Sequence, residues 1–157
     1  MTTLTFTPDM PGLPDPERDP QFYEGVPARR LAAWVIDVGI VLAIGVPIAL
    51  LFGIVTLGLG FVLFWFLISS VGYVYRVITL AGGSATWGMR AMGIEMRRHD
   101  GSRFDLITAA LHAGIYALSI GVLVLQALSC LMILGTRYRQ GLSDIILRTT
   151  AINRPVD

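Results

Sequence analysis

The fold of this chain is decided by residues 31–75, LAAWVIDVGIVLAIGVPIALLFGIVTLGLGFVLFWFLISSVGYVY, a run in which Asp37 is the only charged residue. A membrane span needs about 20 apolar residues, so this run has room for two spans. We expect one span at about residues 31–52 and a second at about 61–76, joined by a glycine-rich turn. The sequence therefore predicts a helical transmembrane hairpin.

Asp37 is the first candidate for function because it lies inside the first predicted span. An ionised aspartate near the middle of a membrane helix costs about 2.5 to 3.5 kcal/mol, so it faces a polar partner or a polar cavity. Counting back from Arg76, at the end of the second span, places the hydroxyl groups of Ser69, Ser70 and Tyr73 at its depth. Two interpretations stay open: Asp37 joins the helices through hydrogen bonds, or it binds a proton or another ion.

The composition and the arginines beside the hairpin indicate a small integral membrane protein. Charged residues make up 15% of the chain and hydrophobic residues 54%, outside the usual balance of a soluble domain. Arg29 and Arg30 precede the first span and Arg76 follows the second, so the positive-inside rule places both ends in the cytoplasm. The arginines are spread along the chain and the net charge is +1, which argues against a nucleic-acid partner. We expect a multi-pass membrane protein with a cytoplasmic N-terminus.

Residues 1–27 form a polar, proline-rich N-terminal tail. The tail lacks a basic start followed by an apolar stretch, so it does not resemble a cleavable signal. Its prolines prevent regular helix and strand pairing, and its composition fits a disordered leader. The alternative is an extended strap that becomes ordered on a larger partner, with Phe22 and Tyr23 as its anchoring side chains.

Residues 77–103, which follow the hairpin, are predicted to form a cytoplasmic loop. The Gly83–Gly88 stretch has the outer spacing of a phosphate-binding loop. Met89 and Arg90 stand where that motif requires Lys followed by Ser or Thr, so we expect no nucleotide site. Residues 92–98 are typical of a short strand, and the next four residues are typical of a turn.

We expect no cofactor, no metal site and no enzymatic activity. His99 lies in the predicted turn and His112 stands alone in an apolar helix, so neither has a second ligand at metal-binding spacing. Cys130 is the only cysteine, which excludes an internal disulfide. The sequence also gives no recognisable pair of nucleophile and base.

The third apolar element, residues 104–135, has more than one conceivable topology. A single crossing would place the arginines of the C-terminal tail, residues 136–157, outside the cytoplasm, against the positive-inside rule. Two crossings would need about 40 residues. We expect an interfacial helix at about 104–118, followed by a short or re-entrant element that returns the chain to the cytoplasm, with a lone crossing as the alternative.

Residues 148–153 resemble a strand that would pair with residues 92–98 if both lie on one side. The predicted fold is an all-α membrane protein with short β-like segments at the cytoplasmic face.

Three motifs occur in order along the chain. They are Arg30 followed by Asp37 seven residues later, the Gly83–Gly88 loop followed by Arg90, and Arg139-Gln-Gly-Leu-Ser-Asp144. Together they resemble the RDD family of small bacterial membrane proteins, which is named for one arginine and two aspartates. The resemblance covers about residues 28–153 and assigns the motif positions to Arg30, Asp37 and Asp144.

The resemblance makes Asp144 a second candidate for function. Asp144 follows a glycine and Ser143, and a residue in this setting commonly caps a helix, here one beginning at Ile145. Ser143 stands where the family often has histidine. The charge of Asp144 also suits a cluster with Arg30 or Arg90 that ties the third element to the hairpin at the cytoplasmic face.

The resemblance implies no settled biochemical activity, although ion or solute transport has been proposed for some family members. We expect an accessory or scaffold subunit of a larger bacterial inner-membrane complex, in contact with lipid and with other membrane subunits or further copies of itself. The alternative is a proton-coupled transporter in which Asp37 carries the proton and Arg30 tunes it. Its weakness is that the spans contain one acid, whereas transporters generally use paired repeats or several polar sites.

Overall fold

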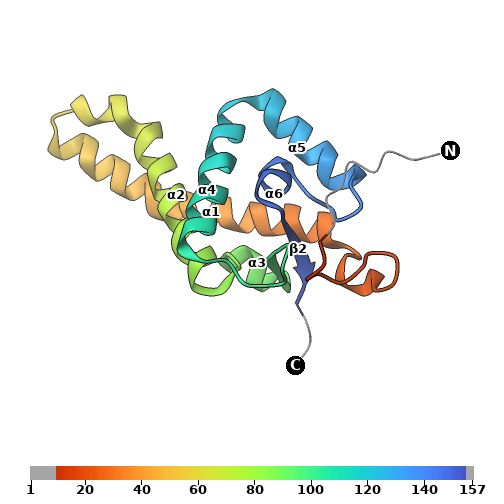
Figure 1. The fold of residues 1–157 in the computed structure, drawn as a ribbon. Helices are drawn as coiled ribbons and strands as arrows, with labels where there is room; N and C mark the ends of the chain where they lie inside the picture. The colour runs from red at the N-terminus through yellow and green to blue at the C-terminus, as the bar shows by residue number, and fades with distance from the viewer. Residues whose placement is uncertain (1–9, 155–157) are drawn as a thin grey trace.

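The computed structural model describes residues 10–154, so residues 1–9 of the predicted tail and the last three residues of the chain lie outside the described part. The described part is mainly helical (Figure 1). Its helices are α1 (Val26–Val55), α2 (Phe64–Gly83), α3 (Trp87–Ala91), α4 (Leu106–Gly121), α5 (Leu123–Gly135) and α6 (Leu142–Leu147). Two 3-10 turns, η1 (Pro20–Phe22) and η2 (Leu59–Leu63), and two strands, β1 (Ile94–Arg98) and β2 (Thr149–Asn153), complete it.

The helices α1 and α2 form the long hairpin. Within residues 10–154, two helical stretches are long and apolar enough to cross a membrane, and these two helices provide them. Leu57 and Gly58 turn the chain with positive φ angles, and the Leu57 side chain is 95% exposed. Figure 1 shows the closed end of the hairpin projecting beyond the other helices. Many large apolar side chains of both helices are exposed, as expected for helices that face lipid.

The second helix is longer than the sequence predicted. We expected it to end at Arg76, but α2 continues for two more turns to Gly83, where Ser84 adopts a left-handed conformation. Arg76 does not mark the end because its guanidinium is buried inside the fold against the ring of Tyr116, at 3.9 Å from the ring centroid. The predicted loop 77–103 therefore contains the end of α2, the short helix α3 and the strand β1.

A two-stranded antiparallel sheet joins the segment after α2 to the C-terminal part of the chain. Ile94 pairs with Asn153 and Arg98 with Thr149, which confirms the predicted strand pairing. The sheet packs on the start of α1 and the end of α2 in a cluster of buried apolar residues, which includes Val26, Leu80, Ile94, Met96, Phe104, Ala109 and Ala151. This cluster fixes the base of the hairpin.

The third apolar element is a sharply bent pair of helices. The axes of α4 and α5 differ by 119° at a break next to Val122, so α5 runs back instead of continuing α4. Helix α4 packs along α2, and the Tyr73 hydroxyl of α2 donates a hydrogen bond to the carbonyl of Ala110 in α4 at 3.4 Å. Figure 1 shows α5 descending from the bend toward α6. This return brings α6 and β2 to the base of the hairpin.

The described part of the N-terminal tail packs on the chain itself and includes Phe22 and Tyr23, the side chains predicted to anchor a partner. Tyr23 is 5% exposed, and it contacts Tyr138 edge to face at 6.0 Å between ring centroids. Phe22 packs against the same small apolar cluster, which also contains Met10 and Ile152. The aromatic side chains therefore have apolar partners within the chain itself.

Candidate functional site

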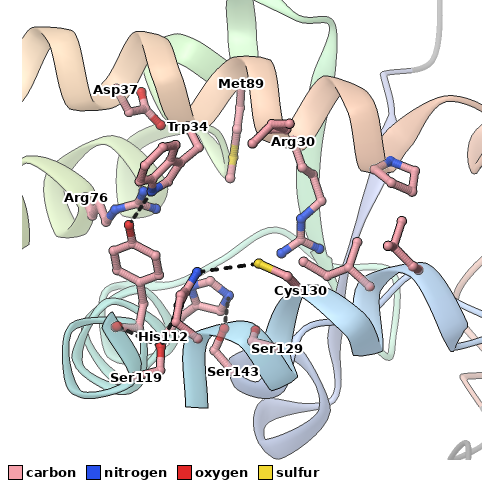
Figure 2. Close-up of a pocket in the computed structure, with 16 residues that line it drawn as sticks. Arg30, Trp34, Asp37, Arg76, Met89, His112, Ser119, Ser129, Cys130 and Ser143 are labelled. Atoms are coloured by element: carbon pink, nitrogen blue, oxygen red, sulfur yellow. Dashed lines mark hydrogen bonds between the residues drawn. The ribbon is translucent and has the colours of Figure 1, made fainter. Parts of the chain in front are cut away.

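A cavity of about 400 Å³ lies between α1, α4 and α5 (Figure 2). Its lining residues are Pro27, Arg30, Leu31, Trp34, Asp37, Arg76, Met89, His112, Tyr116, Ser119, Gln126, Ser129, Cys130, Ile133, Leu134 and Ser143. The wall includes Asp37 of one polar cluster, and Arg30, His112 and Ser143 of a second cluster centred on Asp144. The three motif positions of the sequence are therefore brought to one region of the fold.

The carboxylate of Asp37 is 2% exposed and accepts three hydrogen bonds from α2 and α3. The Tyr75 hydroxyl donates to Oδ1 at 2.7 Å, and the Gly88 backbone N–H donates to the same oxygen at 2.9 Å. The Thr86 hydroxyl donates to Oδ2 at 2.6 Å. Since each donor lies on a segment other than α1, the carboxylate ties three helices together.

The approach of α3 to Asp37 depends on Thr86 and Gly88. Thr86 is the N-cap residue of α3, and its hydroxyl oxygen accepts from the backbone N–H of Met89 at 3.1 Å while it donates to Asp37. A Cβ atom on Gly88 would overlap the carbonyl oxygen of Ala33 and would lie 2.7 Å from Asp37 Oδ1. Only glycine lets the backbone of α3 come this close to α1.

The predicted partners of Asp37 were wrong. The Ser70 hydroxyl donates to the carbonyl of Phe66 within its own helix, Tyr73 bonds Ala110, and Ser69 is not among the hydrogen-bond partners of Asp37. The estimate of depth assumed that Arg76 lies at the membrane surface where the second span ends. Arg76 instead stacks on Tyr116 inside the fold, and α2 continues to Gly83. Tyr75 lies six residues beyond Ser69, about 9 Å along a helix, which is the size of the error.

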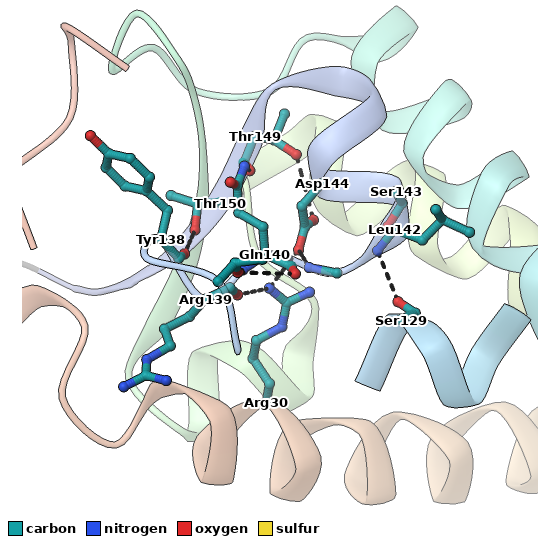
Figure 3. A network of polar contacts seen from close by, with 12 residues as sticks. Arg30, Ser129, Tyr138, Arg139, Gln140, Leu142, Ser143, Asp144, Thr149 and Thr150 are labelled. Carbon is teal, nitrogen blue, oxygen red and sulfur yellow. Dashed lines mark hydrogen bonds and ion pairs between the residues drawn. The ribbon is translucent and has the colours of Figure 1, made fainter. Parts of the chain in front are cut away.

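Asp144 is completely buried and is the centre of the second cluster (Figure 3). Arg30 Nη1 lies 2.6 Å from Asp144 Oδ2, and His112 Nε2 lies 2.8 Å from Oδ1. The backbone N–H of Gly141 donates to Oδ2 at 2.9 Å. The predicted pairing with Arg30 is confirmed, whereas Arg90 bonds the carbonyl of Ala85 instead.

Asp144 also caps a helix, although at a different position from the predicted one. The helix α6 begins at Leu142 with Gly141 as its N-cap, so Asp144 occupies the third helical position and its carboxylate accepts from the N-cap N–H. Burial raises the pKa of the Asp144 carboxyl, but the Arg30 guanidinium, His112 and the Gly141 N–H outweigh burial and hold that pKa well below its usual range.

His112 is the functional residue that the sequence analysis missed, since it was taken to be alone in an apolar helix. The fold brings it against Asp144 and against the hydroxyl of Ser143, 3.2 Å from the same Nε2 atom. In a nucleophilic triad the serine and the carboxylate bond different nitrogens of the ring, and here both share one. Nδ1 of His112 is buried with no hydrogen-bond partner among the described residues.

The cavity wall beside Asp37 carries a second cation. Arg76 stacks on Tyr116, whose hydroxyl accepts from Trp34 Nε1 at 2.7 Å. Ser119 and Gln126 continue this polar wall and are joined by a hydrogen bond of 3.2 Å. No local pattern predicts the stacking, because Arg76 and Tyr116 are 40 positions apart and belong to different predicted elements. Within residues 10–154, no three His, Cys, Asp or Glu side chains form a group that could hold a metal ion.

Comparison with known protein families gives one finding. The model of the RDD family matches residues 25–148, a stretch that contains both carboxylate clusters and the whole cavity wall. Neither the curated proteins nor the solved structures include a match to this chain.

Proposed function

The chain belongs to the RDD family of small membrane proteins, and from this premise we propose that it is a non-catalytic accessory or scaffold subunit of a larger bacterial inner-membrane complex. Its N-terminus lies in the cytoplasm, and the bent pair α4 and α5 forms a re-entrant element. The β1 and β2 pairing supports this topology because it requires the segments on either side of the third element to meet.

The observation that carries the proposal is that the carboxylates of Asp37 and Asp144 are both bonded to other segments of the fold. Asp37 directs its oxygens to donors on α2 and α3, and Asp144 directs its oxygens to Arg30, His112 and Gly141. Carboxylates bonded in this way hold helices in fixed positions. A residue that carries ions across a membrane must instead exchange its partners during each cycle. The motif therefore supports a role as a folding lock.

A second observation supports an assembly role. Two long helices and one bent pair are too few to enclose a transport path within one copy, and large apolar side chains are exposed along the hairpin. Part of that apolar surface is available to other membrane helices, which associate through close packing. The partners expected are membrane subunits or further copies of this chain.

The transport alternative is favoured by one feature, the partly polar cavity that reaches Asp37. In that alternative several copies assemble around a path, and Asp37 exchanges a proton with the cavity. Arg30 bonds Asp144 and not Asp37, which weakens the expected tuning of Asp37 by Arg30.

The test is to extract the tagged protein from its native membrane in a mild detergent and to identify the proteins that accompany it by mass spectrometry. Stoichiometric recovery of other membrane subunits is expected, and it should be lost in Asp144→Asn and kept in Asp15→Asn, whose ion pair is exposed. Recovery of this chain without other subunits, as a monomer or as a homo-oligomer, would overturn the accessory-subunit proposal. Proton flux in liposomes that disappears in Asp37→Asn, with the assembly intact, would establish the transport alternative.

A further inference from the structure

Arg76 is a largely buried residue whose guanidinium lines the cavity and has no acceptor among residues 10–154. The residue is 8% exposed, and its guanidinium lies over the ring of Tyr116. Among residues 10–154 no hydrogen bond or ion pair involves the guanidinium of Arg76, whereas Arg30, Arg97 and Arg137 each pair with a carboxylate. A guanidinium has five N–H donors, and those of Arg76 are reached from the cavity that the residue lines. The fold therefore leaves donors unused on the cavity wall.

The carboxylate in the same cavity does not satisfy Arg76. Both oxygens of Asp37 accept hydrogen bonds from Tyr75, Thr86 and Gly88, so their acceptor positions face α2 and α3. Asp37 forms no ion pair with the guanidinium within the part of the chain that the structure describes. Asp37 accepts no hydrogen bond from Arg76 in the described part of the chain. The donors of Arg76 are therefore available to a molecule that enters the cavity.

The lining of the cavity defines the chemistry of that molecule. Arg76 stacks on Tyr116 in the cavity wall, and the hydrogen-bonded pair Ser119 and Gln126 lines the same cavity. Figure 2 shows Arg76 and Ser119 in this wall. The rest of the lining contains the polar residues Arg30, His112, Ser129 and Ser143 together with apolar side chains. Among the apolar ones, Leu31 and Leu134 are 64% and 60% exposed and so open the cavity toward the surroundings of α1 and α5. A volume of about 400 Å³ is within the range of small-molecule sites.

We propose that this cavity binds an anionic amphiphile, with its oxyanion head, a phosphate or a carboxylate, held by Arg76 and its apolar chain lying along the Leu31 and Leu134 side. The planar guanidinium matches the two oxygens of either head group. Basic pockets between membrane helices are suited to acidic lipid head groups. This site goes beyond the accessory role and does not depend on it, since either a scaffold or a transporter can hold such a ligand.

Cys130 provides the reporter for a test. It is the only cysteine of the chain, it lines the cavity, and it is exposed. The full chain is placed in nanodiscs of phosphatidylcholine alone, of phosphatidylcholine with phosphatidylglycerol, or of phosphatidylcholine with a long-chain fatty acid. A fourth sample has phosphatidylcholine with inorganic phosphate in the buffer. The rate at which the neutral reagent N-ethylmaleimide alkylates Cys130 is measured in each.

The expected result is slower alkylation with phosphatidylglycerol or the fatty acid, by about tenfold when the ligand is at ten times its Kd. Arg76→Gln should abolish this protection, and the exposed Arg137→Gln should keep it. A Cys130→Ser chain with Leu57→Cys in the hairpin turn should show no protection. Equal rates in all lipids, equal protection in Arg76→Gln, or protection by inorganic phosphate alone would overturn the proposal.

A second measurement covers the case in which Arg76→Gln does not fold. Native mass spectrometry of the wild-type chain, released from phosphatidylglycerol nanodiscs, should show one retained anionic lipid. Arg76→Lys keeps the charge but loses the planar pair of donors, so it should retain less lipid at equal melting temperature. Wild-type protein that retains no anionic lipid above the level of phosphatidylcholine would also overturn the proposal.

Discussion

Arg30 Nη1 and Asp144 Oδ2 lie 2.6 Å apart, although 114 positions separate the two residues in the chain. Arg30 stands at the start of α1, and Asp144 lies in α6, after the bent pair of helices. The same carboxylate bonds His112 of α4. One buried acid thus joins the first helix, the third apolar element and the C-terminal segment.

The first prediction concerns the stability that this ion pair supplies. Asp144→Asn should lower the free energy of unfolding by about 3 to 5 kcal/mol, because it leaves Arg30 without its charged partner in a buried site. The measurement is thermal melting of the detergent-solubilised protein by circular dichroism. Asp15→Asn, which breaks an exposed pair with Arg137, is the control and should leave the melting temperature unchanged. Equal melting of both variants would contradict the assignment of Asp144 as a lock.

The second prediction follows from the low pKa of Asp144. A carboxyl whose pKa is depressed in the folded state contributes stability at pH values above its unfolded pKa of about 3.9, and this contribution is lost as the pH falls toward the folded pKa. The difference in melting temperature between wild type and Asp144→Asn should therefore be constant from pH 7 to about pH 5 and should shrink below about pH 4. A difference that stays constant down to pH 3 would argue against an ionised Asp144 in the folded protein.

The third prediction distinguishes the observed partners of Asp37 from those expected from the sequence. Thr86→Val removes a hydroxyl that both donates to Asp37 and caps α3, so the free energy of unfolding should fall by about 2 to 4 kcal/mol. Ser70→Ala removes a hydroxyl that bonds only its own helix, and it should change stability by less than about 0.5 kcal/mol. Melting in the same detergent measures both. A larger effect of Ser70→Ala would restore the partner set predicted from the sequence.

The fourth prediction concerns the contact of α3 with α1. Gly88→Ala should destabilise the fold by about 1 to 3 kcal/mol, because the new Cβ overlaps the backbone of Ala33. Gly82→Ala is the matched control, since a Cβ at this position of α2 meets nothing within 4 Å and alanine favours the helix. The control should melt at the same or a higher temperature. Two variants that melt alike would show that the close approach is not required.

Local patterns in the sequence were sufficient for the hairpin, for the two strands and for one long-range contact. The apolar run predicted the hairpin, the strand patterns predicted that residues 148–153 pair with 92–98, and the motifs offered Arg30 or Arg90 as the partner of Asp144, of which Arg30 is the one observed. Each of these three predictions rests on a pattern of neighbouring residues or on a motif of the family.

The errors arose where burial depends on distant parts of the chain. Arg76 resembles a residue at the end of a span, and only Tyr116, on another helix, makes its burial acceptable. The same displacement moved the partners of Asp37 from Ser69 to Tyr75. His112 has no polar neighbour in the sequence. Its partner Asp144 reaches it only because the chain reverses between α4 and α5.

The fifth prediction concerns the third element, whose two ends should be on one side of the membrane. Arg103 precedes the element and Arg137 follows it, and the β1 and β2 pairing keeps both flanking segments at the base of the hairpin. In a Cys130→Ser chain, cysteines placed at Arg103 and at Arg137 should both react with an impermeant maleimide from the cytoplasmic side. A cysteine at Leu57, in the exposed turn of the hairpin, should react only from the opposite side. Reaction of the Arg137 position from the side of Leu57 would show instead that α4 and α5 together make a single crossing, and the positive-inside rule would then fail for the C-terminal arginines.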